Sequence, residues 1–139
     1  MRCFIDTNIF IFLCSDTGGE VDKDIRDMLE DCGNTVIMSS ESLREIAALL
    51  QDGRIHIQGM HSFDDVMGRV NALGFEIRYV AEAHMKTRYK LVPAPNHSDP
   101  ADLMIIAQAI TEGIPLISSD GKFAHYEKQG LEFIYNRRK

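Results

Sequence analysis

The sequence lacks most of the features that would place it in a specialised class of protein. It has 3 cysteines in 139 residues and no Cys-x-x-Cys pair, so we expect buried, reduced thiols and no disulfide framework. No apolar run reaches the length that spans a membrane. The 5 histidines have no zinc-type spacing to the cysteines, and we interpret them as surface or loop residues: His56, His61, His84, His97 and His125.

Positive charge is also scarce. The net charge is -6, so the composition does not indicate a nucleic-acid-binding protein, and an RNA partner would have to meet metal ions or a local basic patch. The first residues hold one arginine and no apolar stretch followed by a small-residue cleavage site, which predicts a cytoplasmic protein without a secretory signal. A hydrophobic share of 45% over 139 residues is typical of one soluble domain, which we place at 1–139.

The chain does contain a regular alternation of short buried strands with helices. We expect strands at residues 3–5, 35–38, 75–80, 115–118 and 131–134. We expect helices from Thr7 or Asn8 onwards, from Pro100 until Gly113, and at residues 20–32, 39–50, 62–73, 81–91 and 122–129. Turns fit residues 15–19 and 93–98, and residues 54–61 fit a short strand or a loop. Because the strands are continuous apolar runs, the pattern predicts a three-layer α/β/α fold with a central parallel sheet and helices on both faces.

Acidic side chains stand where such a fold would gather them. Asp6 ends the first strand and Asp120 follows the fourth, whereas Glu45 and Asp102 lie in helices that follow strands or loops. Sites in parallel sheets form beyond the carboxyl ends of the strands, so we expect these carboxylates to converge. A hard divalent cation with oxygen ligands, Mg²⁺ or Mn²⁺, would relieve their repulsion. Such a site suits hydrolysis of a phosphodiester.

Each acid taken alone has a structural explanation. Asp99 and Asp102 are suited to cap or support the start of the helix that Pro100 opens. Asp120 precedes a glycine and suits a turn, and Glu45 could pair with Arg44 or another surface base. Asp6 is the hardest to explain in this way, because a buried strand end rarely carries an unpaired acid. The combination of acids therefore carries the prediction of a site.

Four motifs occur in a fixed order along the chain. They are an aspartate followed by a small residue and Asn, a serine-led helix presenting a Glu, an aspartate opening a helix rich in Ile and Ala, and a strand ending in Ser-x-Asp; they lie at Phe4–Phe10, Ser39–Ile46, Asp102–Ala109 and Leu116–Phe123. In this order they resemble the PIN domain family, and most of all the VapC-type toxin ribonucleases. Residues 52–96 match none of these motifs.

The resemblance implies a Mg²⁺- or Mn²⁺-dependent endoribonuclease. Its catalytic and metal-binding residues would be Asp6, Glu45, Asp102 and Asp120. Asn8 and Ser118 would support these acids by hydrogen bonds, and Asp99 would either cap its helix or add a ligand to a metal-bound water. The resemblance also implies a homodimer and, for a toxin, an antitoxin whose tail enters the acidic groove.

Two basic clusters offer contacts for RNA. Lys86, Arg88 and Lys90 surround Tyr89, and they could hold phosphates while the tyrosine stacks on a base. A solvated helix end with favourable cations is the simpler interpretation. The basic tail at 136–139 could also touch RNA, although a disordered terminus is the simpler interpretation there.

Two other functions fit parts of the pattern. A catalytically inert PIN module would bind RNA or a protein partner through the same fold, but it has little reason to keep four clustered acids. A receiver-like phosphoacceptor also places acids at strand ends. That class needs an acceptor aspartate on a middle strand, whereas the second strand here ends in Met38-Ser39.

Overall fold

The chain folds around one sheet of parallel strands. The computed structural model describes residues 1–15 and 20–138, so most of the turn expected at 15–19 lies outside the described residues. The strands follow the spatial order β3-β2-β1-β4-β5, and each neighbouring pair is parallel. Their bounds are β1 (Arg2–Ile5), β2 (Thr35–Ser39), β3 (Glu76–Arg78), β4 (Leu116–Ser118) and β5 (Phe133–Tyr135).

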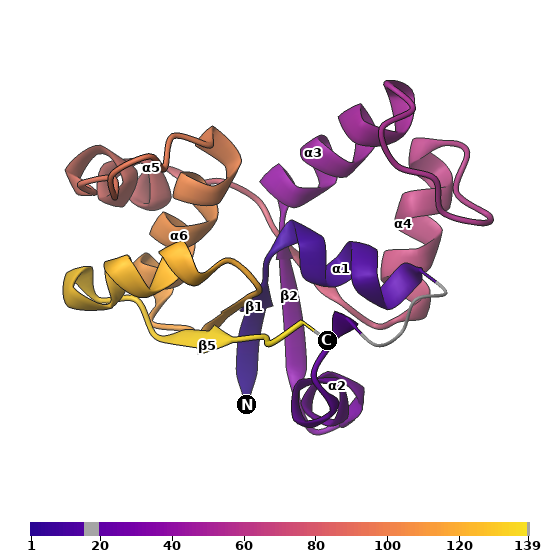
Figure 1. Cartoon of the computed structure of the whole chain (residues 1–139), viewed down its shortest axis with the longest axis horizontal. Coiled ribbons are helices and arrows are strands. Elements are labelled where there is room, and N and C mark those ends of the chain that lie inside the picture. Colours follow the sequence, from indigo (N-terminus) through magenta and orange to yellow (C-terminus); the bar gives the residue numbers. More distant parts are fainter. Residues whose placement is uncertain (16–19, 139) are drawn as a thin grey trace.

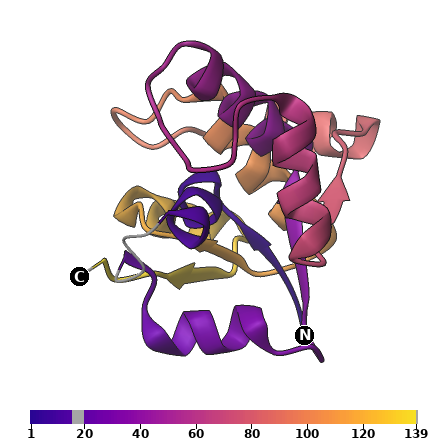
Figure 2. The same ribbon diagram turned by 90° about the vertical axis from the view of Figure 1, so that its right-hand side faces the viewer.

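Helices cover both faces of this sheet (Figures 1 and 2). They are α1 (Thr7–Cys14), α2 (Lys23–Glu30), α3 (Ser40–Gln51), α4 (Phe63–Ala72), α5 (Glu82–Lys90), α6 (Pro100–Glu112) and the 3-10 helix η2 (Gly121–Gln129). Along β1 the side chains alternate, so that Cys3 and Ile5 enter one core and Phe4 enters another. The helices α1 to α4 close the first core, and α6 and η2 close the second. The predicted three-layer α/β/α fold is thereby confirmed.

Most predicted elements are confirmed, and the differences have local causes. The helix expected at 20–32 is shorter, because the side chain of Asp22 accepts a hydrogen bond from the Asp24 backbone N–H and caps α2 there. The helix expected at 122–129 is a 3-10 helix, which apolar spacing over so short a segment does not distinguish from an α-helix. Residues 54–61 form neither a helix nor a strand. The last strand is shifted towards the C-terminus, since Phe133 to Tyr135 pair with β4.

The strand order positions the site. After β1, the chain adds β2 and β3 on one side, whereas β4 and β5 lie on the other side of β1. The sheet therefore has its topological switch point between β1 and β4, where ligands bind in open parallel sheets. The Asp6 backbone N–H donates to the Ile117 carbonyl over 2.9 Å, so the two strands stay paired up to this edge.

The C-terminal tail is not the disordered segment that its composition suggested. Asn136 is fully buried, donates to the Glu20 carbonyl and to Ser119 Oγ, and accepts from the Asp22 backbone N–H. Arg138 pairs with Glu20 and lies over the ring of Phe12. These contacts fix the last residues before position 139 against the segment between α1 and α2.

Two further observations concern features that the sequence lacked. The cysteines are free thiols, but only Cys3 is buried, and the prediction of buried thiols is wrong for the exposed Cys32. Within residues 1–15 and 20–138, no helix is both long and apolar enough to span a membrane.

Candidate functional site

Asp6 lies at the centre of the carboxyl edge of the sheet. Only 4% of the residue is exposed, and each carboxylate oxygen is held by a different donor. Oδ1 accepts from the Thr7 backbone N–H over 2.8 Å, and Oδ2 accepts from Ser118 Oγ over 2.8 Å. Burial, followed by the negative charge of Asp102, raises the pKa of Asp6 to about 7. The two hydrogen bonds and the distant charge of Glu45 affect this pKa less.

Ser118 joins the acids that follow β1 and β4. Its hydroxyl donates to Asp6 and accepts from the Asp120 backbone N–H over 3.0 Å. The side chain of Asp120 in turn accepts from the Lys122 backbone N–H and caps η2. The hydrogen bond expected between Ser118 and the acids is therefore present. The turn expected at Asp120 is present as well, and its role at a metal site stays a prediction.

Asp102 reaches the same edge from the first turn of α6. Asp99 caps this helix, because its side chain accepts from the backbone N–H groups of Ala101 and Asp102. Burial raises the pKa of Asp102 to about 7, and the charges of Asp99, Glu45 and Asp120 add to this effect. The capping alternative for Asp99 is thus confirmed, while its charge also acts on Asp102.

Glu45 lies on α3 at the border of a surface pocket of about 260 Å³. The pocket also contains Asp99 and the side chains of Arg44 and Arg54. Arg44 is bonded to Glu41 and not to Glu45, so the ion pair considered for Glu45 is not the one that forms. Glu45 therefore shares a small pocket with Asp99 and two bases, and its charge acts on Asp102.

Two histidines are not the surface residues that we expected. His97 is 5% exposed, and it lies between Tyr126 and Asp102. Its Nδ1 is 2.8 Å from the Tyr126 hydroxyl, and its Nε2 is 3.1 Å from Asp102 Oδ2. Burial lowers the pKa of His97. His84 is 4% exposed and connects α5 to α6, because its Nε2 lies 2.8 Å from Glu112 Oε2.

The donor set at this edge fits a hard divalent cation. One atom each from His97, Asp102 and Asp120 lies within 4.8 Å of the others, and Asp6 is electrostatically coupled to Asp102. Burial and neighbouring acids raise the pKa of Asp6 and of Asp102, so a bound cation would favour the ionised form of both carboxylates. Oxygen ligands of this kind are those that Mg²⁺ and Mn²⁺ prefer.

Some predicted site residues lie apart from this cluster. Asn8 is exposed and its side chain forms no hydrogen bond within the described residues, so its support of the acids stays a prediction. Lys86 and Lys90 border a shallow pocket on α5 with Met85 and Tyr89, and this pocket shares no residue with the acidic edge. Lys86 also pairs with Glu82 on the same helix. Arg88 is half-buried on α5.

One contact beside the acids was missed at the sequence level. The hydroxyl of Thr7 donates to the hydroxyl of Ser42 over 3.0 Å, and both residues are buried. This bond ties the start of α1 to the first turn of α3, and so it fixes Asp6 relative to the helix that carries Glu45. Thr7 and Ser42 both lie within the sequence motifs, but the motifs do not predict that the two side chains are in contact.

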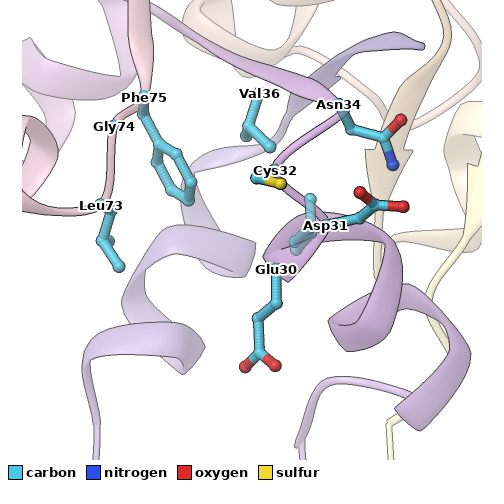
Figure 3. A pocket seen from close by; sticks show the side chains of 9 residues that line it. Glu30, Asp31, Cys32, Asn34, Val36, Leu73, Gly74 and Phe75 are labelled. Carbon is cyan, nitrogen blue, oxygen red and sulfur yellow. The ribbon is translucent and has the colours of Figure 1, made fainter.

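A different pocket, of about 300 Å³, lies at the opposite edge of the sheet (Figure 3). It is formed by residues just before β2 and β3, among them Asn34 and Phe75, and by the end of α2. Phe75 and Val36 line its inner side, while the carboxylate of Glu30 points away from them (Figure 3). Because it opens at the amino ends of the strands, it has no part in the acidic cluster.

Comparison with known proteins agrees with this geometry. The family model of the PIN domain matches residues 3–129. The chain belongs to the PIN domain family. The receiver-like alternative is thereby excluded, and the four motifs lie inside the matched region. No curated protein matches the sequence.

Solved structures with the same PIN fold include chains from toxin–antitoxin complexes. VapBC2 from Rickettsia felis, bound to a promoter DNA fragment, matches with 16% identity and a TM-score of 0.66, over 97% of this chain and 98% of that chain. VapBC-1 from nontypeable Haemophilus influenzae matches with 19% identity and a TM-score of 0.65, over 97% and 98%. FitAcB from Neisseria gonorrhoeae matches with 15% identity and a TM-score of 0.61, over 98% and 97%. At such identities the likeness establishes the fold.

Proposed function

We propose that this PIN domain is a divalent-metal-dependent endoribonuclease and the toxin of a toxin–antitoxin pair. The observation that supports the chemistry most is the burial of Asp6 and Asp102 beside other acids: burial first, and then the charges of neighbouring carboxylates, raise the pKa of both acids to about 7. Acids placed in mutual repulsion at a switch point destabilise the fold unless they serve a ligand. A divalent cation that also binds a phosphate ester is the ligand that suits these acids.

Each side chain has a defined part in this proposal. Asp6, Glu45, Asp102 and Asp120 hold Mg²⁺ or Mn²⁺. When bound, the cation polarises the phosphate and lowers the pKa of a water molecule. Ser118 and the Thr7 backbone N–H fix the two oxygens of Asp6, so this carboxylate cannot turn away. Asp99 orients the start of α6, from which Asp102 projects.

The direct test is cleavage of single-stranded RNA by the purified chain. We expect cleavage with Mg²⁺ or Mn²⁺, loss of activity to background on chelation with EDTA, and recovery when Mn²⁺ is returned in excess. An identically purified Asp6→Asn protein controls for contaminating ribonucleases. Cleavage that persists in EDTA, or a folded protein that cuts no RNA in either metal, would contradict the proposal.

We propose that Arg44 and Arg54 contact RNA phosphates beside the acids, because they border the same pocket as Glu45. Each charge-assisted contact is worth about 1.5–3 kcal/mol at most, and 1.4 kcal/mol corresponds to tenfold in binding. We expect substitution of both arginines by alanine to raise KM for RNA about 10-fold with little change in kcat. The plot of cleavage rate against salt concentration should be flatter for this variant, since fewer phosphates are neutralised.

The bases of α5, Lys86, Arg88 and Lys90, are proposed to hold a more distant part of the RNA strand. Their alanine variants provide the matched comparison, since they remove similar charge from a surface that lies apart from the acids. We expect them to raise KM by about 2- to 3-fold only. A larger effect from α5 than from Arg44 and Arg54 would reverse the assignment of the two surfaces.

The antitoxin is a proposal that the structural neighbours support, because several neighbours are complexes of a toxin with its antitoxin. The homodimer is a proposal that rests on the family resemblance alone. An acidic edge on a chain of net charge -6 suits a partner segment rich in Lys and Arg. Light scattering of the chain alone measures the dimer. Co-purification with the product of the adjacent gene tests the antitoxin, and a monomer that binds no such product would contradict both.

The rival function is a catalytically inert PIN module that binds RNA or a protein. It predicts no affinity for divalent cations at the acidic edge. Calorimetric titration with Mn²⁺ therefore separates the two functions without any assay of cleavage.

A further inference from the structure

His97 is the buried polar side chain at this edge that the family motifs do not include. It lies in the loop between α5 and α6, 5% exposed, and its two ring nitrogens contact different partners. The rings of Phe123 and Tyr126 pack around it, with centroids 5.6 Å and 5.5 Å away. A histidine held on both sides and packed in this way has one fixed orientation.

The hydrogen bonds of Tyr126 decide which nitrogen of His97 carries the proton. The Tyr126 hydroxyl accepts from the Ala94 backbone N–H over 2.8 Å and meets His97 Nδ1 over 2.8 Å. Tyr126 is fully buried, and among the described residues these are its only hydroxyl contacts. Its single proton is therefore satisfied only if it is donated to Nδ1, because an unpaired buried donor is costly.

The hydrogen bond from Tyr126 therefore also determines the protonation of the second ring nitrogen, Nε2. With Nδ1 accepting, the neutral imidazole carries its proton on Nε2, which then donates to Asp102 Oδ2 over 3.1 Å. The second oxygen of Asp102 has no hydrogen bond within the described residues. One oxygen of this acid is thus fixed by His97 while the other is left for a ligand.

We propose that Tyr126 and His97 form a hydrogen-bonded relay that orients Asp102 towards the cation, with His97 as a positioning residue and not as a metal ligand. The inference rests on the proposed function, because it takes Asp102 as a ligand. Partners of this kind orient the ligand carboxylate, and their loss typically lowers metal affinity about 10- to 100-fold.

The variant Tyr126→Phe removes only the hydroxyl and leaves the ring that packs beside His97. Nδ1 then has no donor, the ring is free to take the other tautomer, and the lone pair of Nε2 would face the carboxylate. We expect the Kd for Mn²⁺, measured by calorimetry on the folded protein, to rise about 10-fold. His97→Leu should raise it at least as much, whereas His97→Gln, which keeps an N–H donor, should restore most of the affinity.

A purely structural role would weaken the fold without changing metal affinity selectively. Leu131→Ala supplies the matched control, since Leu131 is buried in the same core as Tyr126 but belongs to the turn before β5. It should lower the unfolding temperature to a similar degree and leave the Kd for Mn²⁺ unchanged. Two-bond ¹H–¹⁵N spectra of the His97 ring give a second readout, in which the wild type should show the proton on Nε2.

The outcomes separate the relay from the function on which it rests. If the wild type binds Mn²⁺ and the Tyr126→Phe and His97→Leu proteins bind it within 2-fold of the wild type, the relay is overturned and the nuclease proposal stands. A proton found on Nδ1, or an equal loss of affinity in Leu131→Ala, also overturns the relay. If the wild type itself does not bind Mn²⁺, both proposals fail.

Discussion

The Asp6→Asn protein should be folded and inactive. Asparagine has the shape of aspartate, and its side-chain oxygen can still accept from Thr7 or Ser118, so the contacts that join β1, α1 and β4 survive. What is lost is the negative charge for the cation. Lewis-acid stabilisation of a phosphoryl transition state is worth several kcal/mol, and about 4 kcal/mol corresponds to about 10³-fold in rate.

The measurement is the initial rate of RNA cleavage at saturating Mn²⁺, beside thermal unfolding of the same samples. Asp64→Asn is the matched control, because Asp64 is exposed in the first turn of α4 and has no part in the acidic edge. It should cleave like the wild type. Activity within 10-fold of the wild type for Asp6→Asn, in a preparation that unfolds cooperatively, would remove Asp6 from the chemistry.

The location of Asp6 could be predicted because its signal is local. A short apolar run that ends in an acid predicts both a buried strand and the position of its carboxyl end. In a parallel sheet, all such carboxyl ends lie at the same edge. The same argument predicted Asp120, whereas the hydrogen bond from Ser118 was expected from the family resemblance. The carboxyl ends of parallel strands lie at one edge of the sheet, so Asp6 and Asp120 could be grouped from their positions alone, although they are far apart in the chain.

His97 and Asn136 could not be predicted, because their environments are made by residues with no periodic relation to them. His97 lies in a proline-containing loop, and its burial depends on Tyr126 and Asp102, whose positions relative to the loop are set by η2 and α6. Asn136 is fixed by Glu20 and Asp22, more than 100 residues earlier in the chain. Composition favoured a surface histidine and a mobile tail, and tertiary contacts overrode both.

The metal-free protein should lose stability as the pH rises from about 4 to about 7. The pKa of Asp6 and that of Asp102 are raised to about 7 in the folded chain, from 3.8 for an ordinary aspartate. The folded state therefore holds protons that the unfolded state releases at lower pH, so stability falls with rising pH in this window and levels off above it. For Asp6, which is 4% exposed, the loss between pH 5 and pH 8 is about 2–3 kcal/mol.

Urea unfolding at pH 5, 6, 7 and 8 in the presence of EDTA measures this loss. Other groups titrate in the same range, so the informative quantity is the difference between the wild type and Asp6→Asn, which has no charge at this position. We expect the variant to become the more stable of the two by pH 8. A loss of equal size in both proteins would show that Asp6 is already ionised at pH 5.

Mn²⁺ should reverse the loss at the upper end of this window. A cation that binds only the folded state stabilises it by about 2.7 kcal/mol at a concentration 100 times its Kd, and ionised carboxylates bind it more tightly than protonated ones. The stabilisation by Mn²⁺ should therefore be larger at pH 8 than at pH 5 in the wild type and small at both in Asp6→Asn. The negative charge that weakens the empty edge is the same charge that holds the ion. Stability without metal should therefore fall with rising pH, while the affinity for Mn²⁺ rises.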